Sequence, residues 1–106
     1  MKENIVLTES TYYILLSLYN PQHGYGIMQL TAQLSGGRVK LAAGTLYGAL
    51  NALCEKGWIK LLPVEKDSRK KQYLLTQDGL AVLKGELARL KQLVANGESI
   101  LAEEEK

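Results

Sequence analysis

The side chains best placed to do chemistry in this sequence are cations. Arg69, Lys70 and Lys71 follow one another in a polar segment between two apolar runs. Consecutive cations on an exposed turn can contact the phosphate oxygens of a nucleic acid. A solvated turn is the alternative, because Glu65 and Asp67 stand close to the three cations. The place of this segment in the fold must decide between the two interpretations.

Hydrogen-bonding side chains form a second group, within a helix expected from about Ala43 to Lys56. One face of that helix is expected to be buried through three leucines at helical spacing, Leu46, Leu50 and Leu53. On the opposite face the Tyr47 hydroxyl could bind a phosphate. Asn51, four residues on, could pair with adenine or be an ordinary solvated residue. Lys40, just before the helix, is either a phosphate contact or a plain surface charge.

Catalytic and metal-binding chemistry find little support in the composition. His23 and Cys54 are the only residues of their types. A single histidine excludes a His–His metal motif, and a single cysteine excludes an intrachain disulfide or a thiolate-rich zinc site. We therefore expect a structural His23, a half-buried Cys54, no enzymatic activity, no cofactor and no metal.

The length and the charge distribution narrow the class of protein. A chain of 106 residues fits one domain. Cations outnumber acids by nine to five in residues 1–75, but acids outnumber cations by six to four in residues 76–106. A polyanionic partner would therefore meet the first three quarters of the chain. We see neither a membrane span nor a secretion signal, so we expect a cytoplasmic protein.

Hydrophobic spacing predicts two helices before the one at 43–56. The segment Thr8–Tyr19 opens on a good N-cap residue and is apolar on nearly every face. A helix of that kind must be buried all round, which indicates that a partner chain covers one side. A turn at Pro21–Gly26 leads into a second helix that stops at Ser35-Gly36-Gly37.

The spacing changes after Gly57. Trp58–Val64 and Gln72–Thr76 are expected to be two short strands, and Pro63 indicates that the first is an edge strand or that the proline marks a strand end. Thr76 then caps a long helix, which Asn96-Gly97 is expected to break or end. Leucines and a valine recur along this helix at spacings of three and four, which predicts a seam against another helix: Leu80, Leu83, Leu87, Leu90, Val94 and Leu101.

This order of elements predicts a mostly α-helical protein with a small β-hairpin, a winged helix-turn-helix followed by a C-terminal dimerisation helix. Residues 1–76 would form the DNA-binding part and residues 77–106 the dimerisation helix with a frayed tail, within one compact unit. In such a domain the third helix can enter the major groove of DNA and the hairpin can contact phosphates alongside.

Several blocks of the sequence resemble the PadR transcriptional regulators, in particular their short, LmrR-like members with one C-terminal helix. The blocks are His23–Ile27, Gly44–Tyr47, Leu50 with Leu53 ahead of Gly57–Ile59, and Arg69–Thr76 followed by Gly79. The resemblance implies a homodimer in which the last helix of each subunit packs on the first helix of its partner.

The resemblance also assigns roles to residues. It places Thr45 and Tyr47 on the recognition-helix motif and Arg69, Lys70 and Lys71 on the wing, where family members contact operator DNA. With Lys40 and Asn51 these form the expected DNA-binding set. The expected dimer interface comprises Tyr12, Leu16, Leu83, Leu87, Leu90 and Val94.

Three departures from the family pattern matter. Asp67-Ser68 replace the usual wing glycines, and Gly48 stands where relatives often carry proline. The helix from residue 77 on contains no aromatic residue, so an aromatic drug site built on that helix is not supported. An effector of unknown identity, bound between the last and first helices, would act by changing the separation of the two DNA-binding heads.

We therefore predict a sequence-specific DNA-binding regulator, a homodimeric repressor that binds a two-fold symmetric operator. The alternative is a winged-helix protein–protein interaction module that does not bind DNA.

Overall fold

The computed structural model describes residues 5–64 and 70–105, and the elements below are those of this part of the chain. In chain order they are α1 (Glu9–Ser17), β1 (Gln22–His23), α2 (Gly24–Leu34), α3 (Ala43–Glu55), β2 (Ile59–Leu61), β3 (Gln72–Leu75), α4 (Gln77–Leu101) and the short 3-10 helix η1 (Ala102–Glu105). The fold is mostly helical with a small antiparallel sheet, as the sequence predicts.

Threonine side chains cap the beginnings of α1 and α4. The hydroxyl of Thr8 accepts a hydrogen bond from the backbone N–H of Thr11, 3.1 Å away, at the start of α1. At the start of α4, Thr76 accepts from the N–H of Gly79 at 3.1 Å. Both caps satisfy an N–H that the first helical turn leaves without a partner, as expected for threonine at these positions.

The three strands form one sheet in the order β1-β3-β2, with both pairs antiparallel. β2 is an edge strand, as Pro63 predicts. The sequence analysis missed β1 and assigned its residues to a turn. This strand is only two residues long, paired as Gln22 with Tyr73 and His23 with Gln72, so it has no alternating apolar pattern to reveal it.

The core lies where the helices meet the sheet. Its buried side chains come from all four α-helices and from β2 and β3: Ile14, Leu15, Leu18, Ile27, Leu46, Leu50, Leu53, Ile59, Tyr73 and Leu83. The leucine stripe of α3 is buried as predicted, with Leu46 and Leu50 fully inaccessible to solvent. Gly57 ends the α3 segment with a φ of 78°, a left-handed conformation that side chains other than glycine rarely adopt.

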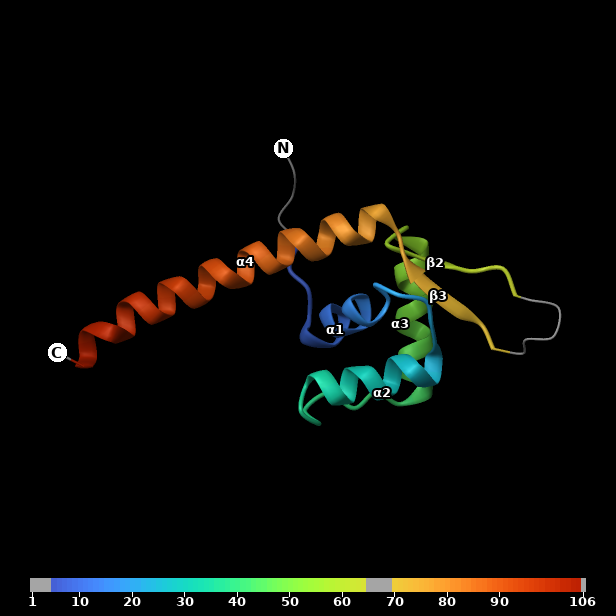
Figure 1. Cartoon of the computed structure of the whole chain (residues 1–106), viewed down its shortest axis with the longest axis horizontal. Coiled ribbons are helices and arrows are strands. Elements are labelled where there is room, and N and C mark those ends of the chain that lie inside the picture. Colours follow the sequence, from blue (N-terminus) through green and yellow to red (C-terminus); the bar gives the residue numbers. More distant parts are fainter. Residues whose placement is uncertain (1–4, 65–69, 106) are drawn as a thin grey trace.

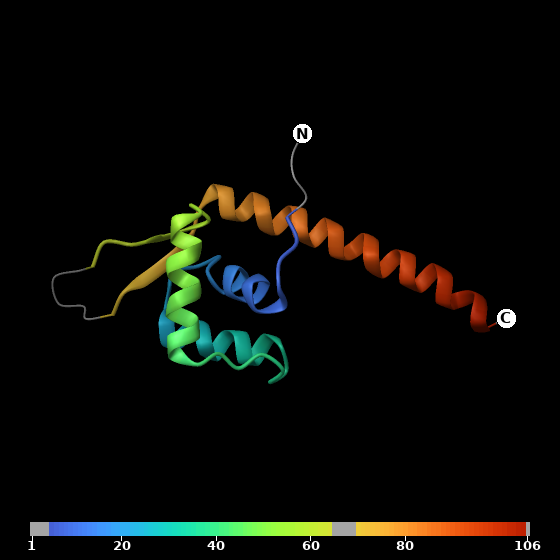
Figure 2. The same ribbon diagram turned by 180° about the vertical axis from the view of Figure 1, so that it is seen from behind.

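The body of the molecule has a projection at each end. Figure 1 shows α1 between α4 and α2, with α3 crossing α2 and the β2–β3 hairpin extending to one side. The C-terminal half of α4 extends beyond the body on the opposite side, and the reverse view in Figure 2 agrees. The chain is accordingly elongated, with extents of 64 × 36 × 20 Å.

The long helix differs from expectation in two respects. It continues through Asn96 and Gly97 to Leu101, so the predicted break is wrong. An internal glycine costs a helix only about 0.5–1 kcal/mol, which the good helix formers on both sides offset. In addition, Leu83 is only 6 % exposed and already belongs to the core of its own chain.

Candidate nucleic-acid interface

The outward face of α3 is free of contacts that would bury it. Thr45, Tyr47 and Asn51 are all exposed, on the part of the helix surface that the buried leucines leave open to solvent. Gly48 lies between them, and α3 passes through it without interruption. The structure therefore brings three of the predicted site residues together on one accessible helical surface of small and hydrogen-bonding groups.

Tyr47 is not an isolated surface side chain. The residue is 45 % exposed, and the end of its ring rests against Gly24, the first residue of α2. A methyl group at Gly24 would overlap the Tyr47 hydroxyl and lie 2.9 Å from its Cζ atom. The Tyr47 hydroxyl of α3 is thus held at the beginning of α2.

The loop before α3 contributes two cations to this region, Arg38 and Lys40. Lys40 is exposed, as a phosphate contact must be. Arg38 instead donates to the carboxylate of Glu9 at the start of α1, with Nε–Oε1 and Nη2–Oε2 distances of 2.9 Å. This pair ties the loop to α1, so Arg38 already has a partner within the chain.

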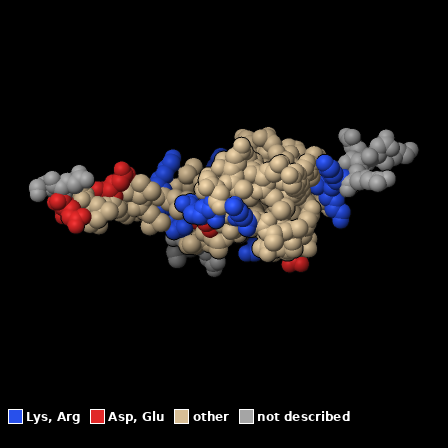
Figure 3. Space-filling view, turned by 90° about the horizontal axis from the view of Figure 1, so that it is seen from below, with Lys and Arg blue, Asp and Glu red and all other residues tan. Residues whose placement is uncertain are grey.

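The hairpin supplies further positive charge. Lys70 and Lys71 are exposed at the beginning of the returning arm, just before β3, and Arg69 lies outside the described residues. In Figure 3 basic side chains gather on the body and beside the hairpin, whereas acidic ones gather at the far end of α4. The charge separation predicted from the two parts of the sequence is therefore also a separation in space.

The predicted dimer residues fall into two groups. Leu83 is buried in the core, and Tyr12 and Leu90 are half-buried where α1 meets α4. Leu16, Leu87 and Val94 are 36 %, 43 % and 60 % exposed. Sequence analysis missed two more exposed apolar residues on α4, Leu93 at 53 % and Ile100 at 68 %, because they lie outside the 3–4 spacing that it followed.

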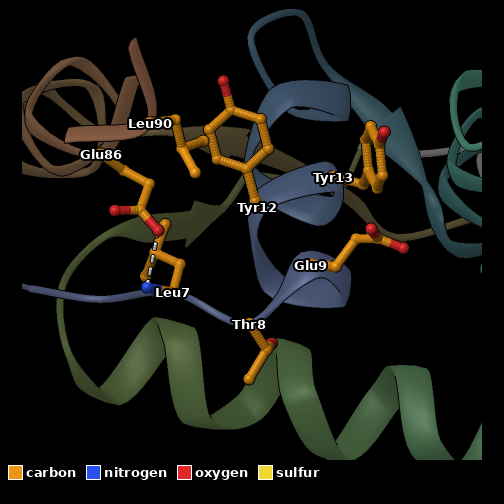
Figure 4. A pocket seen from close by; sticks show the side chains of 7 residues that line it. All are labelled: Leu7, Thr8, Glu9, Tyr12, Tyr13, Glu86 and Leu90. Carbon is orange, nitrogen blue, oxygen red and sulfur yellow. Dashed lines mark hydrogen bonds between the residues drawn. The ribbon is translucent and has the colours of Figure 1, made fainter. Parts of the chain in front are cut away.

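A pocket of about 240 Å³ lies at the junction of α1 and α4. Figure 4 shows the side chains around it, with Tyr12 beside Leu90 and Tyr13 on the other side of α1. The residues that line it are Leu7, Thr8, Glu9, Tyr12, Tyr13, Glu86 and Leu90. Aromatic groups therefore do reach a pocket between the first and last helices, but α1 provides them and α4 does not.

Glu86 is a charged residue that is only 2 % exposed. Its carboxylate accepts the backbone N–H of Leu7 at 2.8 Å and pairs with the Arg89 guanidinium through two hydrogen bonds. The bonds from Arg89, assisted by that of Leu7, lower the pKa of Glu86 although burial alone would raise it. Sequence analysis missed this residue, yet its place three residues after Leu83 and four before Leu90 puts it on the inward side of α4.

The histidine and the cysteine, whose side-chain types are often catalytic, have structural roles in this fold. His23 caps α2, since its Nδ1 accepts the N–H of Gly26 at 3.1 Å. Cys54 is half-buried against the core, and burial raises the pKa of its thiol. Burial likewise raises the pKa of Tyr73, with smaller contributions from Cys54 and Tyr47.

Within residues 5–64 and 70–105, no group of three or more His, Cys, Asp or Glu side chains could hold a metal ion.

Three helices followed by a hairpin, with the outer face of the third helix exposed beside it, define a winged helix-turn-helix domain. A sequence model of the transcriptional regulator PadR-like family matches residues 14–85. The chain therefore belongs to the PadR-like family of transcriptional regulators. No curated protein sequence gives a significant match. Among the described helices, none is both long and apolar enough to cross a bilayer.

Solved structures share the fold of this chain. The RosR protein of H. salinarum is 28 % identical, with a TM-score of 0.66 over 92 % of this chain and 93 % of that one. A PadR family transcription regulator from Clostridium difficile gives a TM-score of 0.71 at 22 % identity, over 89 % and 99 % of the two chains. Bordetella bronchiseptica BpsR, whose DNA binding is regulated by 6-hydroxynicotinic acid, gives 0.67 at 19 % identity, over 87 % and 65 %.

Proposed function

We propose that the chain is a sequence-specific DNA-binding repressor that acts as a homodimer on a two-fold symmetric operator. Residues 1–76 would form its DNA-binding part and residues 77–106 its dimerisation part. The observation that carries this proposal is the division of α3 into two faces. Leu46, Leu50 and Leu53 anchor one face in the core, while the other presents small and hydrogen-bonding groups to solvent.

The exposed face of α3 suits the major groove of DNA. Small residues let a helix approach the base edges closely, and an amide such as that of Asn51 can pair with adenine. Tyr47 and Thr45 carry hydroxyls that can bind phosphates or bases. These contacts would select the sequence, while Lys40, Lys70, Lys71 and Arg69 would supply affinity that depends on salt.

The exposed apolar residues of α4 support the homodimer. The C-terminal half of this helix projects from the body and carries Leu93, Val94, Ile100 and Leu101, each more than half exposed. A single chain leaves these side chains in water at a cost of roughly 25 cal/mol per Å² of apolar surface. A second copy whose α4 and α1 pack on this region would bury them and hold two α3 helices at a set separation.

The pocket between α1 and α4 is the site that we propose for an effector. It lies where the dimerisation helix meets the body, so a ligand there can bias the angle between them only by binding the two arrangements with different affinity. The regulation of BpsR by 6-hydroxynicotinic acid shows that a protein of this fold responds to a small aromatic acid.

The decisive test is selection of fragments of the source genome by the purified full chain at two salt concentrations. We expect recovery of a short inverted repeat, bound more weakly at higher salt. Fluorescence anisotropy on the recovered repeat should then show weaker binding by the Tyr47→Ala variant with no change in fold. If no duplex is retained even at low salt, the alternative interaction module, with the wing cations bound to an acidic partner, replaces this proposal.

A further inference from the structure

Gly24 and Tyr47 meet at the junction of α2 and α3. Gly24 is buried and opens α2, whereas Tyr47 belongs to the exposed face of α3. A Cβ atom at Gly24 would overlap the Tyr47 hydroxyl, and it would lie 2.9 Å from Cζ and 3.4 Å from Cε1. The end of the phenol ring therefore occupies the space that any other residue at position 24 would fill.

The backbone around Gly24 is held firmly on both sides. Before it, Gln22 and His23 pair with Tyr73 and Gln72 of β3. After it, the N–H of Gly26 donates to the imidazole of His23. Gly24, which the Tyr47 ring contacts, therefore follows directly after β1, the strand that pairs with β3 of the hairpin.

We propose that Gly24 is a positioning residue for Tyr47, leaving a space that holds the phenol in one orientation before DNA is bound. This inference rests on the proposed DNA-binding function. Ordering a side chain on binding costs free energy, so a ring that is already ordered binds more tightly than a free one. Because Gly24 follows β1, which pairs with β3, the contact between Gly24 and Tyr47 also places the hydroxyl relative to the cations just before β3.

The effect of a methyl group at position 24 separates this role from a structural one. The atoms that the methyl would displace are the far end of the Tyr47 side chain, which can rotate away into solvent. Alanine is also a better helix residue than glycine. Gly24→Ala is therefore expected to leave the free energy of unfolding unchanged or slightly higher while it displaces the ring.

The test measures operator affinity in a double-mutant cycle of Gly24→Ala and Tyr47→Ala on the full chain. We expect Gly24→Ala to weaken binding about three- to tenfold beside Tyr47 and to have no further effect in the Tyr47→Ala background. Gly85→Ala is the matched control, since a methyl there meets nothing within 4 Å and lies on α4. It should leave the affinity unchanged.

Each other result overturns the inference in a recognisable way. An equal loss in both backgrounds would mean that Gly24→Ala acts through the α2 backbone. Full affinity of Gly24→Ala, with Tyr47→Ala still weakened, would overturn the inference and leave the proposed function standing. A wild-type chain that retains no duplex would overturn both.

A measurement on the free protein tests the contact without DNA. Nuclear Overhauser effects between the Gly24 Hα protons and the Tyr47 ring are expected in the wild type. Their absence from a folded chain would also overturn the inference, even if Gly24→Ala proved too unstable for binding assays.

Discussion

The buried carboxylate of Glu86 on α4 accepts the backbone N–H of Leu7, 79 residues earlier in the chain, at 2.8 Å. This bond fixes the segment before α1 against the long helix at the edge of the α1–α4 pocket. The same carboxylate pairs with Arg89, whose Nη2 lies 2.9 Å from Oε2. The carboxylate thus joins α4 to the start of the winged domain and helps to set the angle at which α4 leaves it.

The first prediction concerns this carboxylate. Glu86→Gln loses the charge that Arg89 and Leu7 stabilise, so the free energy of unfolding at pH 7 should fall by about 1–3 kcal/mol. Because the folded state lowers the Glu86 pKa from its usual 4.5, the carboxylate stabilises the fold fully above that value. The stabilisation is lost as the pH falls through the lower folded pKa.

Urea unfolding from pH 7 down to about pH 3 measures the effect. The difference between wild type and Glu86→Gln should be largest near neutrality and should shrink in acid. Glu98→Gln, at an exposed position of α4, should change stability by no more than about 0.5 kcal/mol at any pH. A difference that grows as the pH falls would contradict the lowered pKa.

Much of the fold could be predicted because local signals agreed with one another. The caps at Thr8 and Thr76, the leucine stripe of α3 and the change of spacing after Gly57 each mark an element that the structure contains. The strand β1 could not be predicted, because two residues paired to a distant strand leave no periodic pattern. The break expected at Asn96-Gly97 is absent because the small free-energy cost of a glycine within a helix does not outweigh the stability of the long helix around it.

Some features of the candidate site could likewise be predicted from the sequence, whereas others depend on tertiary packing. The exposure of Thr45, Tyr47 and Asn51 follows from helical spacing, since the leucines determine which face points inward. The contact between the Tyr47 ring and Gly24 depends on how α2 crosses α3, which no local sequence pattern encodes. The pairing of Arg38 with Glu9, 29 residues apart, is likewise a product of tertiary packing and removes a cation that sequence alone leaves free.

The second prediction concerns two glycines of α4 with opposite surroundings. A methyl group at Gly79 would overlap the backbone carbonyl oxygen of Trp58, which cannot move without breaking its hydrogen bond from Thr76. Gly79→Ala should lower the free energy of unfolding by about 1–3 kcal/mol. Gly85→Ala, where the space is open, should raise it by about 0.5–1 kcal/mol. Thermal or urea unfolding checks both signs, and equal effects at the two sites would refute the packing argument.

The third prediction separates the core of the single chain from the proposed dimer surface. Leu87 is 43 % exposed, so Leu87→Asp should leave the chain folded and raise the dimer dissociation constant at least about 100-fold. Leu83→Asp, at 6 % exposure, should unfold it. Ala88→Asp, exposed one residue further around the helix, is the control and should remain dimeric. Sedimentation with circular dichroism distinguishes these outcomes, and a stable Leu87→Asp dimer would place the interface elsewhere.

The fourth prediction concerns Lys70 and Lys71, the two cations just before β3. Phosphate contacts contribute to affinity through counterion release, which is independent of sequence. Reversing both charges with Lys70→Glu and Lys71→Glu should therefore weaken binding to operator and non-operator duplexes alike, and reduce the slope of log affinity against log salt by about two. Fluorescence anisotropy over a range of salt concentrations gives both quantities.

The control for the hairpin must keep the net charge equal. Lys84→Glu with Lys91→Glu reverses two exposed charges on α4, and sedimentation can verify that this variant keeps the wild-type oligomeric state. If charge acted only through the net total, the two double variants would lose affinity equally. If the hairpin contacts DNA, only the Lys70 and Lys71 double variant should lose affinity and change the salt slope. The charges on α4 should have little influence, because salt screens charges that lie more than about 10 Å away.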